Sequence, residues 1–188
     1  MKSGILVKST AEGAFMWSND RLQQAAYNSM SETTRKDMHK KLGFLLWELG
    51  LLREEEWMIF MAANQMNTYA ELESDSCLGN EVAELNLQAA TLSLNKGAIY
   101  PALKLLLKAE KHMVMENRWE YFYDLTLDLL TTLADARLRV GETQTAMDIA
   151  TEIVENAKSH DDIFPAHIII LQCVVSGNDR NYDEGVEK

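Results

Sequence analysis

Apolar residues recur at helical spacing along most of the chain. The clearest run lies between residues 31 and 50, where five apolar positions fall on one helical face: Met38, Leu42, Leu45, Leu46 and Leu49. Ser31 precedes the run as a candidate N-cap, and Gly50 follows it, where a glycine commonly ends a helix. The pattern therefore predicts a helix between these two residues.

Further helices are predicted on both sides of this one. One covers about residues 20–30 and another about 54–66, followed by a polar stretch at 67–80 that we expect to contain a loop. Beyond it, five more apolar sets with helical spacing begin at Val82, Ala102, Trp119, Ala146 and Phe164. The chain is thus predicted to be helical over most of its length.

Two segments depart from this regular pattern. Within residues 1–17, Ile5, Val7, Phe15 and Trp17 indicate short edge strands. The segment HIIILQCVV, at residues 167–175, is rich in β-branched residues and is compatible with a buried strand or a helix. Its helical neighbours and the spacing of its apolar residues favour the helix.

A pattern of small residues occurs twice. Gly97 and Gly141 each separate two predicted helices, and alanines precede and follow them at matching distances. Antiparallel helices approach to roughly 8–10 Å only where the crossing side chains are small, and the spacing resembles a tetratricopeptide (TPR) helix pair. The expected packing residues are Ala90, Gly97, Ala102, Ala109, Ala134, Gly141, Ala146 and Ile153. The predicted fold is all-α, a TPR-like array of helical hairpins (an α-solenoid).

A third, weaker copy of the pattern lies near the end of the sequence. Cys173 takes the place of the small residue and Gly185 that of the following alanine. The last residue, Lys188, falls within this unit, so the helix at 163–176 would expose apolar surface. We therefore expect that the protein continues or that another chain covers this end.

Composition and charge narrow the function. Of 188 residues, 47% are apolar, with 2 prolines and 9 glycines, which favours long helices around a sizeable core. The net charge of −11 argues against binding to nucleic acid or to anionic membrane surfaces. Two cysteines without a CxxC motif, and no signal-peptide core, lead us to expect a cytoplasmic protein.

One stretch resembles a known family. The sequence NDRLQQAAY, followed by an arginine and a histidine one helical turn apart, is similar to the predicted ATPases of the STAND class, which are AAA-like proteins of multidomain signalling with serine/threonine or histidine kinase domains. The residues that carry the resemblance are Asp20, Arg21, Gln23, Gln24, Ala25, Ala26, Tyr27, Arg35 and His39. The segments Asn64–Asn67, Ala83–Ala90 and Trp119–Leu130 also look like family landmarks.

The resemblance implies a domain organisation. Residues 1–50 would be the C-terminal part of a winged-helix-like region that follows an ATPase core, and residues 51–188 a truncated TPR-like array. At Asn19 the family has a histidine, which in related switch ATPases senses the nucleotide, so that role is in doubt here.

The chain has no phosphate-binding loop. The nearest glycine–lysine pair, in LNKGAIY, lacks the other residues of that motif. We therefore expect no catalytic residue, cofactor site or metal site in this chain, while ATP and magnesium would belong to an ATPase domain of a longer protein.

Three clusters of polar or aromatic residues have two interpretations each. His39, near Arg35 and two lysines, could contact an acidic partner or a phosphate, or lie on a solvated helix face. The segment His160–Asp162 could contribute to a metal site, but capping of a helix is favoured. The aromatics of Trp119–Tyr123 could form a stacking platform, but contacts between repeats are favoured.

These observations lead to one preferred hypothesis and two rivals. The preferred one is a non-catalytic regulatory and protein-interaction region of a STAND-type ATPase in signal transduction. It would couple the state of the ATPase to the binding of a protein partner or of the ATPase domain itself. The rivals are a free-standing TPR-like adaptor that binds peptides or proteins, and an enzyme with a site hidden between helices.

Overall fold

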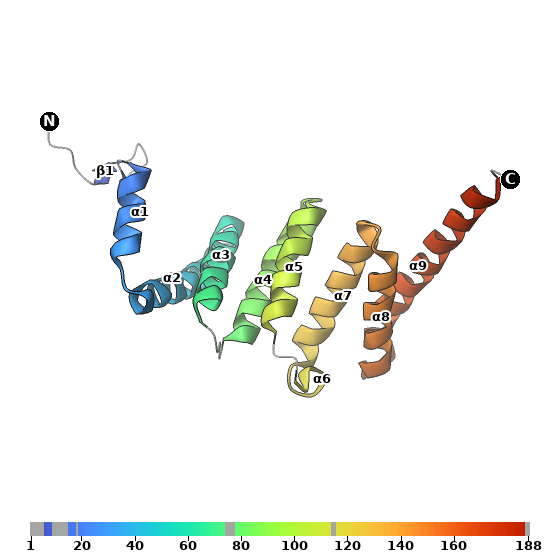
Figure 1. The fold of residues 1–188 in the computed structure, drawn as a ribbon. Coiled ribbons are helices and arrows are strands. Elements are labelled where there is room, and N and C mark those ends of the chain that lie inside the picture. The colour runs from blue at the N-terminus through green and yellow to red at the C-terminus, as the bar shows by residue number, and fades with distance from the viewer. Residues whose placement is uncertain (1–5, 9–14, 18, 74–77, 114–115, 187–188) are drawn as a thin grey trace.

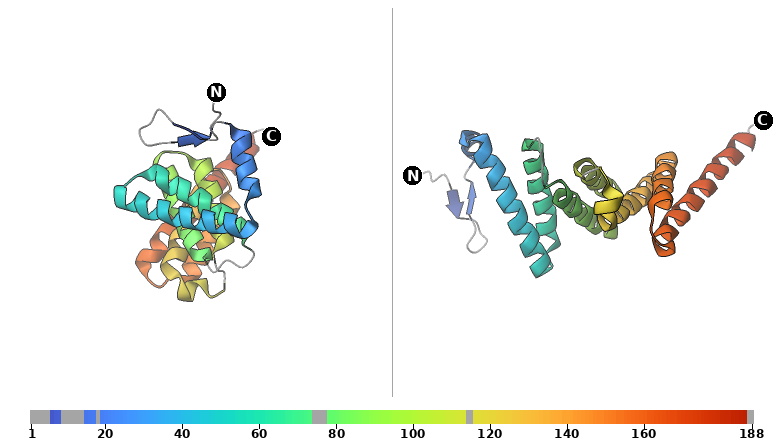
Figure 2. Two further views of the ribbon diagram at one scale, coloured as in Figure 1. Left: turned by 90° about the vertical axis from the view of Figure 1, so that its left-hand side faces the viewer. Right: turned by 90° about the horizontal axis from the view of Figure 1, so that it is seen from below.

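The computed structural model describes residues 6–8, 15–17, 19–73, 78–113 and 116–186, and these residues are all-helical apart from one short β-hairpin. The elements are β1 (Leu6–Lys8), β2 (Phe15–Trp17), α1 (Asp20–Ser29), α2 (Glu32–Arg53), α3 (Glu56–Leu72), α4 (Gly79–Asn95), α5 (Ile99–His112), α6 (Arg118–Tyr121), α7 (Tyr123–Arg139), α8 (Thr143–Asn156) and α9 (His160–Val186). The helices follow one another in a row with the termini at opposite ends (Figure 1). Figure 2 shows the same row from two other sides, with α9 projecting beyond the last hairpin.

The N-terminal elements are short. Strands β1 and β2 pair antiparallel with Leu6 opposite Trp17, which confirms the predicted strands except at Ile5, which lies outside the described residues. Helix α1 begins after Asn19, whose side-chain oxygen accepts a hydrogen bond from the Arg21 backbone N–H at 2.7 Å. No residue of α1 is buried, so this helix packs loosely on the rest of the protein.

Helix α2 begins as predicted but does not end at Gly50. Its N-cap is Ser31, whose hydroxyl accepts a hydrogen bond from the Thr34 N–H at 3.1 Å. The helix continues to Arg53 and ends at Glu54 in a left-handed conformation with φ of 55°. Gly50 is buried, and a Cβ atom there would lie 2.8 Å from Cδ1 of Ile59. The glycine permits close approach of α2 and α3 rather than ending the helix.

The polar stretch at 67–80 contains the connection between α3 and α4, as predicted, and is helical at both of its ends. Helix α3 continues to Leu72, and α4 begins at Gly79. Asn67 and Asn86 are both buried, and their amides form two reciprocal hydrogen bonds of 2.9 and 2.8 Å between α3 and α4. Because each amide satisfies the other, a polar residue occupies a buried helical position without an orphaned donor.

Replacing Asn86 with alanine is expected to lower the free energy of unfolding by about 2 kcal/mol, because the buried amide of Asn67 loses its partner. Urea unfolding followed by circular dichroism measures the change. Asn64→Ala, at an exposed position of α3, is the matched control and should change stability by less than about 0.5 kcal/mol. Equal unfolding midpoints for the two variants would show that the amide pair contributes nothing.

The hairpins α4–α5 and α7–α8 have the same turn. Gly97 has φ of 73° and Gly141 φ of 85°, in the left-handed region that favours glycine. The residue after each glycine donates its N–H to a carbonyl in the last turn of the preceding helix, Ser93 in one hairpin and Arg137 in the other, both at 2.9 Å. These contacts satisfy carbonyls at the helix ends and reverse the chain direction.

Fully buried small residues line the contacts between these helices. The alanines expected at the crossings, and Ile153, have no exposed surface: Ala90, Ala102, Ala109, Ala134, Ala146 and Ile153. One hydrophobic core joins α4, α5 and α7, and another joins α7, α8 and α9. A third core lies between α2, α3 and α4, so each core shares a helix with the next one.

The helix predicted to begin at Trp119 is divided in two. Phe122, with φ of −130° and ψ of 42°, separates α6 from α7. The buried hydroxyl of Thr126 lies 2.8 Å from the carbonyl oxygen of Phe122 and 3.1 Å from that of Arg118. This side chain compensates for part of the helical hydrogen bonding lost at the break.

Helix α9 confirms the helical prediction for residues 167–175, but its buried face differs from the apolar set that begins at Phe164. Ala166, Ile169 and Cys173 pack against α7 and α8. Five further apolar residues of α9 form an exposed stripe: Phe164, Ile168, Leu171, Val174 and Val175. The apolar surface that we expected this helix to expose is therefore present. Because α9 continues unbroken to Val186, Gly185 follows no turn, and the third helix pair is not formed in the described residues.

Candidate binding groove

A groove of about 960 Å³ crosses one face of the row of helices. It extends from the α2–α3 connection across α4 and α7 to the first turns of α9. Its lining residues are Gly50, Leu51, Glu54, Glu56, Ile59, Leu87, Gln88, Thr91, Leu92, Leu127, Asp128, Thr131, Thr132, Asp161, Asp162 and Pro165. Because five helices contribute, the groove exists only when the hairpins are packed side by side.

The groove has acidic ends and a middle of mixed apolar and polar residues. Glu54 and Glu56 lie at the α2–α3 end, and Asp161 and Asp162 lie at the α9 end. Between them are the leucines of α4 and α7, threonines of both helices, and the carboxylate of Asp128. Within the described part of the chain, no lysine or arginine lines this groove. The negative charge of the groove is therefore not neutralised by its own lining residues.

Asp162 at the α9 end and Asp128 in the middle of the groove differ in their surroundings. The Tyr123 hydroxyl donates a hydrogen bond to Asp162 at 2.7 Å, which, with hydrogen bonding by Ser159, lowers the pKa of Asp162. Partial desolvation and the nearby charge of Asp124 raise the pKa of Asp128. Asp162 therefore remains firmly ionised, whereas the charged form of Asp128 would be stabilised by a cation.

A second hollow of about 500 Å³ continues the groove along α9. It shares Thr91, Thr131, Thr132 and Pro165 with the main groove and adds Ile168 of the exposed apolar stripe. Its lining includes Arg139, which forms an ion pair with Asp135 at 2.7 Å. The two hollows share four lining residues and therefore adjoin each other along the row of helices.

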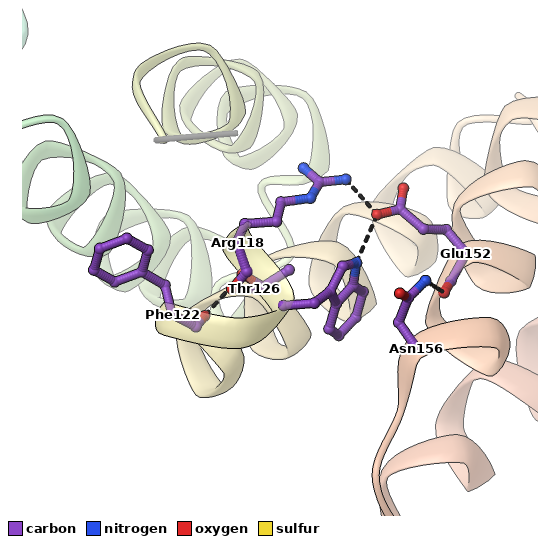
Figure 3. Close-up of polar contacts among 6 residues, drawn as sticks. Arg118, Phe122, Thr126, Glu152 and Asn156 are labelled. Atoms are coloured by element: carbon purple, nitrogen blue, oxygen red, sulfur yellow. Dashed lines mark hydrogen bonds and ion pairs between the residues drawn. The ribbon is translucent and has the colours of Figure 1, made fainter. Parts of the chain in front are cut away.

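Side-chain contacts between helices fix their spacing. Arg118 of α6, which is nearly buried, forms an ion pair with Glu152 of α8, and Trp119 Nε1 donates to the same carboxylate oxygen at 2.9 Å (Figure 3). Between α2 and α4, Trp47 Nε1 donates to Gln88 Oε1 at 2.8 Å, and Gln88 itself lines the groove. The contact between Trp47 and Gln88 joins two helices that line the groove, whereas α6 and α8 contribute no residue to it.

The residues of the NDRLQQAAY stretch, which carries the resemblance, differ in their exposure. Asp20, Arg21, Gln23, Gln24 and Ala25 are exposed on α1, while Ala26 and Tyr27 are partly buried. A hollow of about 380 Å³ between α1 and α2 is lined by several of them. This part of the protein is separate from the main groove.

His39 lies neither on a solvated helix face nor in an exposed basic cluster, in contrast to both interpretations of the sequence. It is buried, and its ring nitrogens lie 2.8 Å from the Tyr27 hydroxyl and 2.6 Å from Gln65 Oε1. The Arg35 guanidinium stacks over the Tyr27 ring at 5.3 Å. These contacts join α1, α2 and α3, so His39 has a structural role here.

The two other clusters can also be placed. At the start of α9, Ser159 accepts a hydrogen bond from the Asp162 N–H at 3.2 Å, so the cap precedes the predicted residues 160–162. Among the aromatics, Trp119 packs beside Tyr123 with ring centroids 5.8 Å apart. Tyr121 and Phe122 are exposed, so the aromatic cluster is only partly used in packing between hairpins.

Comparisons with protein families, curated proteins and solved structures found no match to this chain. None of the helices in the described ranges is long and apolar enough to cross a membrane. In the same ranges, no three His, Cys, Asp or Glu side chains are grouped closely enough to hold a metal ion. The groove is consequently our candidate for the functional site.

Proposed function

We propose that this chain is a non-catalytic protein-interaction region, a TPR-like α-solenoid whose groove binds a segment of a partner protein. The observation that carries the proposal is a 960 Å³ groove formed jointly by successive hairpins, with apolar and charged residues along its length. Such a surface offers area for burial and polar groups for orientation, as peptide-binding grooves require. The recurring glycine turns and buried alanines support the repeat architecture.

The resemblance to STAND-class ATPases extends this proposal to signal transduction. In that account residues 1–50 are a winged-helix remnant, residues 51–188 are the array, and the partner is another protein or an ATPase domain. The lack of buried residues in α1 supports a contact surface there. Because α2 runs through residue 50 and packs on α3, it would connect the two parts.

A free-standing adaptor is the second candidate. The groove favours it, because its lining begins at Gly50 and includes none of the residues from Asp20 to His39 that carry the resemblance. Both candidates need the groove to bind polypeptide, and that property can be tested directly.

Peptides selected from a displayed random library against the whole chain are expected to bind at least tenfold more weakly after Thr132→Trp, because the indole fills the groove. Thr151→Trp is the matched control, since both threonines donate their hydroxyl to the carbonyl four residues earlier, but Thr151 is exposed on α8 outside the groove. Fluorescence anisotropy of the labelled peptides measures the affinities. Failure to select any peptide, or equal weakening by both substitutions, would overturn the proposal.

A further inference from the structure

The charge of the groove indicates which segment it would bind. We propose that its occupant is a basic, amphipathic polypeptide segment, in which lysine or arginine side chains flank apolar ones. This inference rests on the proposed function and adds the chemical class of the partner.

Most carboxylates that line the groove have no ion-pair partner among the described residues of the chain. Glu56 is the only lining carboxylate with an ion pair in the described residues, and its partner Lys96 is about half exposed, so the pair is weak. Glu54, Asp128 and Asp161 have no ion pair among the described residues. Cationic side chains of a partner would therefore meet carboxylates that are not already engaged.

The order of acidic and apolar residues along the groove also favours such a segment. Acidic residues lie at the α2–α3 end and at the α9 end, while the partly exposed Leu92 and Leu127 lie between them, beside Asp128. A purely ionic ligand would leave these leucines uncovered, and an apolar segment would desolvate the carboxylates without compensation. A segment with apolar residues between basic ones satisfies both parts of the surface.

The structure also argues against two other classes of ligand, metal ions and nucleic acids. The described residues bring no three metal-ligating side chains together, so the carboxylates are too dispersed to enclose a metal ion. A nucleic acid would be repelled by the same carboxylates. A polypeptide carries separated positive charges on long side chains, which matches carboxylates placed on several helices.

Three synthetic peptides of equal length test the inference on the whole chain. In the first, lysines flank a central run of leucine and alanine, and in the others glutamine or glutamate replaces every lysine. The lysine peptide is expected to bind at least tenfold more tightly than the glutamine peptide, and the glutamate peptide not at all. Added salt should lower the affinity of the lysine peptide more than that of the other two peptides.

Paired charge removals locate the binding site. The double variant Asp128→Asn with Asp161→Asn is expected to reduce affinity for the lysine peptide about tenfold. The matched control removes the same charge from exposed positions of α8, Asp148→Asn with Glu155→Gln, and should change affinity less than twofold. Circular dichroism verifies that both variants are folded.

The outcomes separate this inference from the proposed function. If the glutamine peptide binds as tightly as the lysine peptide, or if the control variant weakens binding as much as the groove variant, the inference is wrong. The proposed function then stands on the library-selected peptides and on Thr132→Trp. If no library peptide binds either, the proposed function fails as well.

Discussion

Replacing Ala134 with leucine is expected to destabilise the protein by about 3 kcal/mol, because the larger side chain overpacks a tightly packed helix crossing. Ala134 is fully buried in the core shared by α7, α8 and α9. Its neighbours there include Ala146, Ala150 and Ala166, which are also fully buried. Three additional carbon atoms fit at this crossing only if the helices move apart.

Chemical denaturation followed by circular dichroism measures this change. Ala25→Leu is the matched control because Ala25 is exposed on α1, and its midpoint should shift little. Leucine is a good helix former, so helix propensity does not explain a loss at residue 134. An unchanged midpoint for Ala134→Leu would mean that α7 and α8 are not in close contact in solution.

The second large effect is expected at Glu152. Substitution by alanine removes the ion pair with Arg118 and the hydrogen bond from Trp119, and leaves a nearly buried guanidinium without this carboxylate. Losing one partner of a fully buried pair costs about 3–5 kcal/mol. Because the Glu152 side chain is 35% exposed, water reduces the cost, and we expect about 2–3 kcal/mol.

Two further variants separate the contributions of charge and hydrogen bonding. Glu152→Gln retains an oxygen that can accept from Trp119 but removes the charge, so an intermediate loss is expected. Glu155→Ala, at an exposed position of the same helix, should have little effect. Thermal unfolding monitored by tryptophan fluorescence measures all three. A Glu152→Ala variant as stable as Glu155→Ala would show that this contact does not hold α6 on α8.

The hairpin turns could be predicted because their signal is local. Gly97 and Gly141 each end a helix with a positive φ, and the sequence places a glycine where the backbone requires one. Gly50 carries the same local signal but lies inside α2. There the side chain of Ile59 leaves no room for a Cβ atom at residue 50. A glycine that serves close packing cannot be distinguished from one that ends a helix until the partner helix is in place.

The candidate groove could not be predicted because no local pattern describes it. Glu54, Asp128 and Asp161 lie far apart in the sequence and would each be interpreted as an ordinary solvated acidic residue on a helix. The amides of Asn67 and Asn86 similarly indicate a loop or a helix surface when they are considered singly. Only the packing of α3 on α4, and of the hairpins in a row, brings these groups together.

The sequence by itself determined where most helices lie and where the chain reverses, since apolar periodicity and glycine turns act over a few residues. The tertiary structure alone decided which side of α9 is buried. Its apolar residues occupy more than one side, and the surface of α7 and α8 accommodates Ala166, Ile169 and Cys173, while Phe164 and Leu171 remain exposed. Periodicity specifies a helix, whereas the shape of the neighbouring surface specifies the face that packs against it.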